Sequence, residues 1–339
     1  MSWSFQPALG VFEEIRSDWD ALNRSRHNHL LLDSAFVAPL LQHFGGPHVL
    51  LGIDRDSRNP GMALLVKKHP GMWETFQPSQ APLGLILLGY PDDTVEGLRE
   101  MLGQLPGYAL QLSVLQQDPD FSSFRSAGGQ SCTEQMDYIR TARLPVTGTF
   151  EEYWKSRGSN LRHNLARRRR RLTEKGYNAE LLVHRSSGAV ATCVRDYGRI
   201  ESKGWKGTDG TAIAEDNVQG RFYREIFEAF CTRGEGVIYQ LLINGELAAS
   251  DLCLCRDDMM IVLKTTYDER FEEFSPAYLM RQEIMQRIFA ENGIHSVEFY
   301  GRVLDWHTRW TDQIRRMYHI TCFRRPWVRR LKGIAKRFL

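Results

Sequence analysis

The backbone around Ser275 and Pro276 has features suited to binding a phosphate. A strand-like run, residues 259–267, passes through a short acidic loop into a helical pattern that begins at Pro276. Ser275 can cap this helix, and proline is tolerated in a first turn because its missing N–H would have no intrahelical partner. The unpaired N–H groups and partial positive charge of a helix start favour an anion. The residues expected to hold a phosphate or pyrophosphate are Ser275, Pro276, Ala277 and Tyr278; a cap without a ligand is the plainer alternative.

Residues able to move a proton follow the strand-like runs. Carboxylates and imidazoles are common general bases, and a tyrosine can act as an acid. Each also has a plain interpretation as a turn residue, a strand residue facing solvent or a loop histidine. The candidates near the ends of the expected strands are Tyr267, Asp268, Glu298, Asp305 and His307.

Hydrophobic patterning predicts the elements that position these residues. The expected order is strand 237–243, strand 246–255, strand 259–267, helix 276–292 and strand 294–300. Asn244-Gly245 favours a type I′ turn between the first two strands, and Gly293 is expected to end the helix. Within the helix, Leu279, Ile284 and Ile288 share one apolar face.

The first half of the chain repeats this order loosely. A mostly helical segment, 11–44, precedes a hairpin of strands 48–54 and 62–67, a short strand 72–76, a helix 92–105 and a strand 108–115. A proline-containing loop, 78–84, stands where the second half has Ser275-Pro276. We therefore predict an α/β (α+β) fold with two similar halves, the first of them degenerate.

Composition bounds the class of protein. The chain has 339 residues, of which 42% are hydrophobic and 25% charged, which is typical of a globular protein with a sizeable core. Residues 1–6 lack the pattern of a secretory signal, and no run approaches the roughly 20 apolar residues of a membrane span, so we expect a cytoplasmic protein. The six cysteines have no framework spacing. Cys253 and Cys255 are interpreted as core residues, and no metal site is expected.

Three further segments suggest binding surfaces. The helix expected over 157–175 contains five consecutive arginines, which form either a solvated face or a surface for a nucleic acid, a membrane, an anionic carrier protein or cofactor phosphates. Its lack of interleaved aromatics argues against nucleic acid. Trp205 and Lys206 lie in a glycine-bracketed loop that could close on a ligand. The basic tail, 324–339, is either a docked terminus or an amphipathic helix on the inner face of a membrane.

Four of these places together resemble the acyltransferases of the GNAT superfamily, and within them the CelD/BcsL-like branch, which is similar in fold to the FemAB/FemX aminoacyltransferases. The resemblance covers about 150–310. It is carried by the basic helix from Ser159, the Gly204-Trp205-Lys206-Gly207 loop, the run Leu263–Glu269 leading to Ser275-Pro276, and Glu298–Gly301 followed by Trp310. The chain departs from the family at Ala277, where glycine is common, and His307 is the nearest candidate for a lysine that the family often has.

The resemblance implies two tandem GNAT-like domains with mixed, mostly antiparallel sheets, a degenerate one over 1–145 and an acyltransferase domain over 146–323. It also implies an acyl-CoA donor, with acetyl or a longer acyl group, that is attacked directly by an amine or hydroxyl. Backbone N–H groups near Thr266 and Tyr267 would face the thioester carbonyl, Tyr267 would protonate the leaving thiolate, and the base would come from Asp268, Glu298, Asp305 or His307. Trp205, Lys206 and Lys264 would lie on the side of the acceptor, a small molecule or saccharide.

Other donors and functions remain open at this point. The same fold could use an aminoacyl-tRNA docked on the basic helix, or an acyl carrier protein. A non-catalytic, membrane-associated binding module is the alternative from another class.

Overall fold

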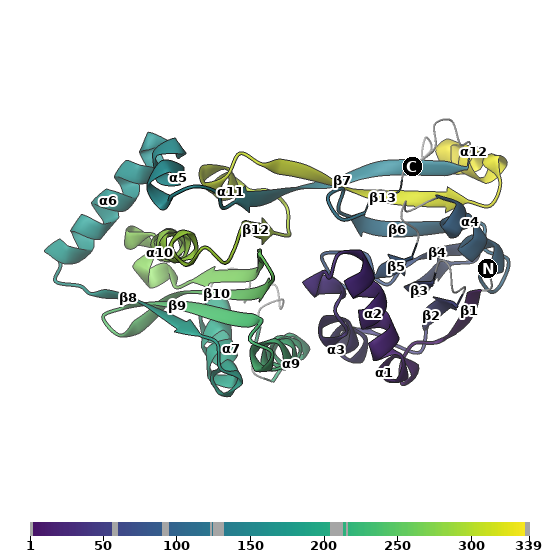
Figure 1. Ribbon diagram of the computed structural model, residues 1–339, viewed down its shortest axis with the longest axis horizontal. Coiled ribbons are helices and arrows are strands. Elements are labelled where there is room, and N and C mark those ends of the chain that lie inside the picture. The colour runs from purple at the N-terminus through teal and green to yellow at the C-terminus, as the bar shows by residue number, and fades with distance from the viewer. Residues whose placement is uncertain are drawn as a thin grey trace. The chain divides into compact units, whose positions relative to one another are not determined.

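The computed structural model describes residues 3–55, 60–89, 95–122, 124, 132–203, 213–214 and 216–335. The chain forms two compact units, one of residues up to Arg140 together with those from Arg316 onward, the other Thr141–Arg315 (Figure 1). The first unit therefore takes its last strand from the far end of the chain, whereas the sequence boundaries assigned 316–323 to the second domain. None of the described helices is both long and apolar enough to cross a membrane.

The second unit is a mixed sheet flanked by helices. Its strands lie in the order β7-β12-β11-β10-β9-β8. They are β7 (Thr133–Pro145, entering from the first unit), β8 (Ala179–His184), β9 (Gly236–Ile243), β10 (Glu246–Arg256), β11 (Met259–Tyr267) and β12 (Ser296–Phe299). The helices are α5 (Phe150–Ser156), α6 (Ser159–Glu174), α7 (Ser187–Glu201), α9 (Val218–Thr232), the 3-10 helix η2 (Glu269–Phe274), α10 (Pro276–Glu291) and α11 (Asp305–Trp310).

Local sequence explains the central part of this unit. Asn244 and Gly245 connect β9 to β10 with φ angles of 52° and 78°, the left-handed values that a type I′ turn needs. In α10 the predicted apolar face is buried, including Leu279, Ile284 and Ile288. Asn292, also left-handed at φ 52°, ends α10 in place of the expected Gly293.

The strands β11 and β12 are the one parallel pair in the second unit's described sheet, and they pair only at their beginnings. The pairing runs from Met259↔Ser296 to Ile261↔Glu298, after which the two strands have no further paired residues. The remaining part of β11 stays paired on its other edge, with β10, up to Tyr267. The parting of these strands exposes one edge of β11 from Val262 onward.

The first unit repeats this arrangement, as the sequence predicted. Its sheet has the order β1-β2-β3-β4-β6-β13, with β5 paired to β3. The strands are β1 (Trp3–Pro7), β2 (Val49–Asp54), β3 (Gly61–His69), β4 (Met72–Thr75), β5 (Ile86–Leu88), β6 (Gln111–Gln117) and β13 (Ile314–Phe323). The helices are α1 (Val11–Glu14), α2 (Arg16–Arg26), η1 (Leu30–Leu32), α3 (Ser34–Phe44), α4 (Val95–Gln104) and α12 (Pro326–Ala335). Because β4 and β6 are parallel and flank α4 in the chain, the order β2-β3-β4-α4-β6 matches β9-β10-β11-α10-β12.

The two units differ in what lies next to the sheet after the parallel strands separate. In the first, the chain before β5 lies against β6: the Gly84 N–H donates to Gln116 O at 3.2 Å, and Leu85 O accepts from Leu64 N of β3 at 3.0 Å. A Cβ on Gly84 would lie 2.1 Å from Leu115 O, so only glycine allows this approach. The chain itself thus occupies the place that corresponds to the exposed edge of β11.

Gly84→Ala is therefore expected to lower the free energy of unfolding by about 1–3 kcal/mol, the usual cost of overpacking. Gly103→Ala is the matched control, because the Cβ there meets nothing within 4 Å and lies in α4. That change should raise stability by up to about 1 kcal/mol through helix propensity. Urea unfolding of both variants checks the pair, and equal effects would contradict the close approach at Gly84.

Candidate active site

A cavity of about 560 Å³ lies in the second unit where β11 and β12 part. One wall is β11, another is the end of β12 with the loop and helix that follow, and the third is the start of α10. The lining residues are Val262, Leu263, Lys264, Thr265, Tyr267, Ala277, Tyr278, Arg281, Phe299, Tyr300, Leu304, Trp306, His307 and Trp310. The structure thus brings Lys264, Tyr267, Ala277, Tyr278 and His307 together, as the sequence analysis expected.

The predicted carboxylate bases lie elsewhere. Asp268 caps η2 through Arg270 N and forms an ion pair with the Arg270 guanidinium at 2.9 Å. Burial raises its pKa, but the hydrogen bonds from Arg270 outweigh burial and hold the pKa below its usual range. Glu298 is fully buried and forms ion pairs with Arg143 at 3.3 Å and Arg315 at 2.8 Å. Neither these two residues nor Asp305 is among the described residues that line the cavity.

The predicted phosphate cradle is also smaller than expected. Ser275 precedes α10 in the left-handed conformation, φ 52°, and its side chain makes no capping hydrogen bond, so that prediction was wrong. The Ser275 N–H donates to Glu272 O at 2.9 Å, and the Tyr278 N–H donates to Ser275 O at 3.0 Å. Because Pro276 has no N–H, Ala277 supplies the one first-turn donor that has no acceptor among the described residues.

Strand register identifies the donors on the exposed edge of β11. The Asp268 N–H donates to Ala248 O at 2.9 Å. In an antiparallel pair, alternate residues bond to the partner strand, so Thr266 also directs its N–H toward β10. The N–H groups of Thr265 and Tyr267 consequently point to the other edge, which β12 has left. The expected carbonyl-binding amides are therefore those of Thr265 and Tyr267, with Thr266 facing the sheet.

The hydrogen bonding of His307 suits it to present a proton-bearing nitrogen to a ligand, although its sequence position suggested a base. Its Nδ1 accepts from the Leu304 N–H at 2.9 Å, which leaves the proton of the neutral ring on Nε2. Burial lowers the pKa of His307 to about 4, and the nearby Arg281 cation contributes to the lowering. The ring stacks on Trp306 with centroids 3.6 Å apart. At neutral pH, His307 therefore presents Nε2–H, because the acceptor nitrogen is already used.

The lowered pKa of His307 should make the free energy of unfolding depend on pH. Between pH 6.5 and about 4 the unfolded chain takes up a proton at His307 that the folded chain does not, so His307 makes stability fall as pH falls through this window. The full loss is about 3 kcal/mol, from 1.36 kcal/mol per pH unit. Urea unfolding at pH 7.5 and 4.5 should show a smaller difference for His307→Gln than for the wild type. An unchanged difference would contradict the buried neutral imidazole.

Of the three residues expected on the side of the acceptor, the structure describes Lys264. Lys264 lines the cavity and pairs with the buried Glu201 at 3.4 Å, and its ammonium lies 5.4 Å from the Tyr223 ring centroid. Trp205 and Lys206 lie outside the described residues. Tyr267 is partly exposed at the cavity, and burial is the main cause of its raised pKa.

Sequence reasoning did not select Arg281, which also lines the cavity. It forms an ion pair of 2.7 Å with Asp251 of β10, and the two side chains are 2% and 0% exposed. Desolvation raises the pKa of Asp251 although Arg281 opposes the shift. The available signal was position: Arg281 is spaced three and four residues from Ile284 and Met285 on the buried face of α10, where a charge requires a buried partner.

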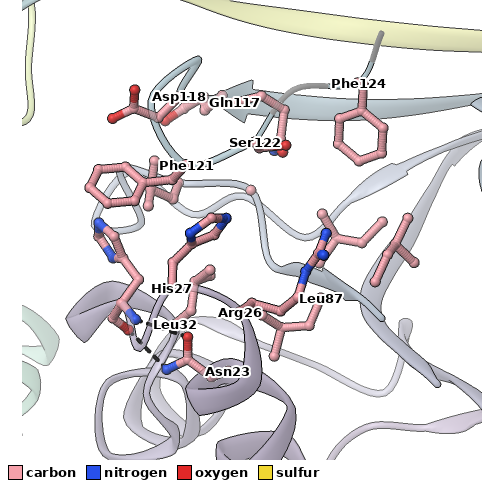
Figure 2. Close-up of a pocket in the computed structure, with 16 residues that line it drawn as sticks. Asn23, Arg26, His27, Leu32, Leu87, Gln117, Asp118, Phe121, Ser122 and Phe124 are labelled. Atoms are coloured by element: carbon pink, nitrogen blue, oxygen red, sulfur yellow. Dashed lines mark hydrogen bonds between the residues drawn. The ribbon is translucent and has the colours of Figure 1, made fainter. Parts of the chain in front are cut away.

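The corresponding region of the first unit holds a much smaller cavity, about 50 Å³ (Figure 2). Asn23, His27, Asp118 and Phe121 surround it, and Asn23 exchanges hydrogen bonds with the backbone of His29. Its volume is close to that of one or two water molecules. The cavity of the second unit is therefore the better candidate for a substrate site.

The basic helix α6 has its three predicted apolar residues, Leu161, Leu165 and Leu172, buried. Several of its cations bind neighbouring elements: Arg169 pairs with Glu283 at 3.0 Å, and Lys175 with Glu273 at 2.7 Å. Part of the arginine-rich surface therefore holds α6 against η2 and α10.

Comparisons with known proteins agree with placing the candidate site in the cavity of the second unit. Residues 159–313 match the family model described as an acetyltransferase (GNAT) domain. No curated protein matches the chain. Among solved structures, FemX has a TM-score of 0.55 at 11% identity over 97% of this chain and 99% of that one. A conserved protein of unknown function from Bacteroides thetaiotaomicron also has 0.55 at 11%, over 91% of this chain and 97% of that one. At 11% identity, these two structures show only that the fold is similar. All residues that line the cavity lie within the segment that matches the acetyltransferase (GNAT) domain family.

Proposed function

We propose that the second unit is an acyltransferase that moves an acyl group from acyl-CoA to an amine. The observation that carries this proposal is the cavity of about 560 Å³ between the parted strands, toward which strand register directs the N–H groups of Thr265 and Tyr267. Such a volume is within the range of small-molecule sites. The GNAT domain match supports the reaction class, and the CelD/BcsL-like branch stays a prediction.

The thioester would lie along the exposed edge of β11. The N–H groups of Thr265 and Tyr267 and the His307 Nε2–H are donors for the carbonyl oxygen, where negative charge develops during attack. The Ala277 N–H and the positive end of α10 would favour the phosphates of the donor. Arg309 adds a cation there, with its guanidinium 5.5 Å from the Tyr278 ring centroid.

The proposed reaction is a direct transfer. The amine nitrogen attacks the carbonyl carbon, a C–N bond forms, the C–S bond breaks, and the sulfur leaves with the bonding electrons. Tyr267, whose phenol carries its proton at neutral pH, supplies the proton that the thiolate takes up. The nitrogen releases its proton to solvent, because none of the described lining residues is a carboxylate. This lining favours an amine over a hydroxyl acceptor, since an amine that enters in its neutral form attacks without a base, whereas a hydroxyl needs one.

Thermal unfolding with CoA thioesters from acetyl to long-chain tests the proposal. A ligand bound only by the folded protein at 100 times its Kd adds about 2.7 kcal/mol and raises the unfolding midpoint. Ala277→Trp, which places a large side chain in the cavity lining, should fold and lose the shift. A wild-type protein whose midpoint no thioester moves would contradict the acyl-CoA proposal.

Aminoacyl-tRNA and acyl carrier protein are the other donors to be compared. Binding of tRNA to α6 should weaken steeply as salt increases, because phosphate contacts release counterions. Binding of a small thioester in the cavity should depend on salt much less. The pairing of α6 cations with Glu273 and Glu283 favours the thioester.

A further inference from the structure

Arg281 is held rigidly at the wall of the cavity. Its Nη2 lies 2.7 Å from Asp251 Oδ2 and 3.1 Å from Thr265 Oγ1. Its guanidinium carbon lies 5.3 Å from the Phe299 ring centroid and 6.0 Å from that of Trp306. Contacts from β10, β11 and the rings thus fix the group where β11 and β12 part.

One nitrogen of the Arg281 guanidinium is not used in these contacts. Arg281 Nη1 is buried and has no hydrogen-bond partner among the residues that the structure describes. A buried donor without an acceptor costs about 1–3 kcal/mol, and more when the group is charged. Since Arg281 is 2% exposed and lines the cavity, a group that enters the cavity can supply an acceptor for Nη1.

We propose that Arg281 Nη1 donates a hydrogen bond to an oxygen of the bound acyl group. This inference rests on the proposed acyl-CoA donor. The acceptor is either the thioester carbonyl or a carboxylate further along the acyl chain, and both offer the same oxygen chemistry. Asp251 already compensates the charge of Arg281, so a neutral carbonyl suffices as acceptor. Charge-assisted hydrogen bonds are about twice as strong as neutral ones, which makes Arg281 a determinant of which acyl groups bind.

A purely structural role predicts something different. If the Arg281–Asp251 pair only ties α10 to β10, its removal changes every ligand's affinity equally. A contact with an acyl oxygen changes only ligands that carry that oxygen. The two roles therefore separate in a cycle that varies the protein and the ligand together.

The experiment measures Kd by calorimetry for acetyl-CoA, S-ethyl-CoA, succinyl-CoA and free CoA. S-ethyl-CoA lacks the carbonyl oxygen of acetyl-CoA and is otherwise closely matched. The variant is Asp251→Asn combined with Arg281→Met, which removes both charges and so avoids an uncompensated buried carboxylate. We expect the wild type to prefer acetyl-CoA over S-ethyl-CoA and the variant to lose about 10-fold of that preference. Should the double variant fail to fold, Arg281→Lys replaces it, since lysine keeps the charge and loses the planar fork.

Each result of these binding measurements either supports or overturns the proposed contact of Arg281 with an acyl oxygen. A drop confined to succinyl-CoA also supports the proposal and places the oxygen on the terminal carboxylate. An unchanged acetyl-CoA to S-ethyl-CoA ratio with unchanged succinyl-CoA binding overturns it, as does an equal loss for all four ligands. If the wild-type protein binds none of them, the proposed acyl-CoA function fails and this inference fails with it.

Discussion

Replacing Asp251 by alanine is expected to lower the free energy of unfolding by about 3–5 kcal/mol. The change leaves the Arg281 guanidinium in a site where it is 2% exposed and without its carboxylate partner 2.7 Å away. Removing one member of a buried pair costs more than the pair contributed, because the remaining guanidinium stays largely out of water and does not lose its proton. Urea unfolding with linear extrapolation measures the loss.

Two comparisons sharpen this prediction. Asp137→Ala breaks the Arg316–Asp137 pair, whose side chains are 60% and 59% exposed, and should change stability by about 1 kcal/mol or less. Asp251→Asn with Arg281→Met removes both buried charges and should recover most of the stability that Asp251→Ala loses. A loss at Asp251 as small as that at Asp137 would contradict a dry, charged pair beside the cavity.

Local features of the sequence were sufficient to predict the elements around the site. The Asn244-Gly245 turn, the apolar face of α10 and the strand before it depend on neighbours within a few residues, so their patterns are visible in the sequence. The loose repeat of the two halves was visible for the same reason. These local signals singled out Tyr267, Tyr278 and His307 as candidate site residues, and in the structure all three line the cavity.

Long-range contacts decided what the sequence could not show. Strand β13 pairs with β6 across about two hundred residues, from Tyr318↔Gln117 to Phe323↔Gln111, and no local pattern assigns it to the first unit. Asp268 and Glu298 looked like candidate bases because they follow or lie in core strands. Arg270 in one case and Arg143 with Arg315 in the other turn them into members of ion pairs.

The helix start shows how an intervening element changes a local motif. The sequence offered Ser275-Pro276 as a standard cap. The 3-10 helix η2 brings the Ser275 N–H onto Glu272 O and leaves Ser275 in the left-handed conformation, so its side chain does not cap α10. The donor phosphates proposed to bind at this terminus would consequently depend on the Ala277 N–H and on Arg309, a residue from α11.

His307→Phe is expected to lower kcat/KM for acyl transfer by about 100- to 1000-fold, the usual effect of removing one donor to a developing oxyanion. Phenylalanine keeps the stacking on Trp306 and the contact with Phe299 but lacks Nε2–H. His307→Gln, which can offer an amide N–H, should recover part of the activity. Steady-state kinetics with the thioester that gives the largest thermal shift measures the three proteins.

His319 in the first unit provides the matched control for this change. It is also a partly buried histidine with a lowered pKa, and its Nδ1 accepts a backbone N–H, from Gln116 at 2.8 Å. His319→Phe therefore imposes a similar structural change away from the cavity and should leave kcat/KM within about 2-fold, provided that both variants keep their thermal midpoints above the assay temperature. If His307→Phe and His319→Phe lose activity equally, the loss is structural and His307 is not the donor. If His307→Phe retains full activity, the amides of Thr265 and Tyr267 stabilise the oxyanion without it.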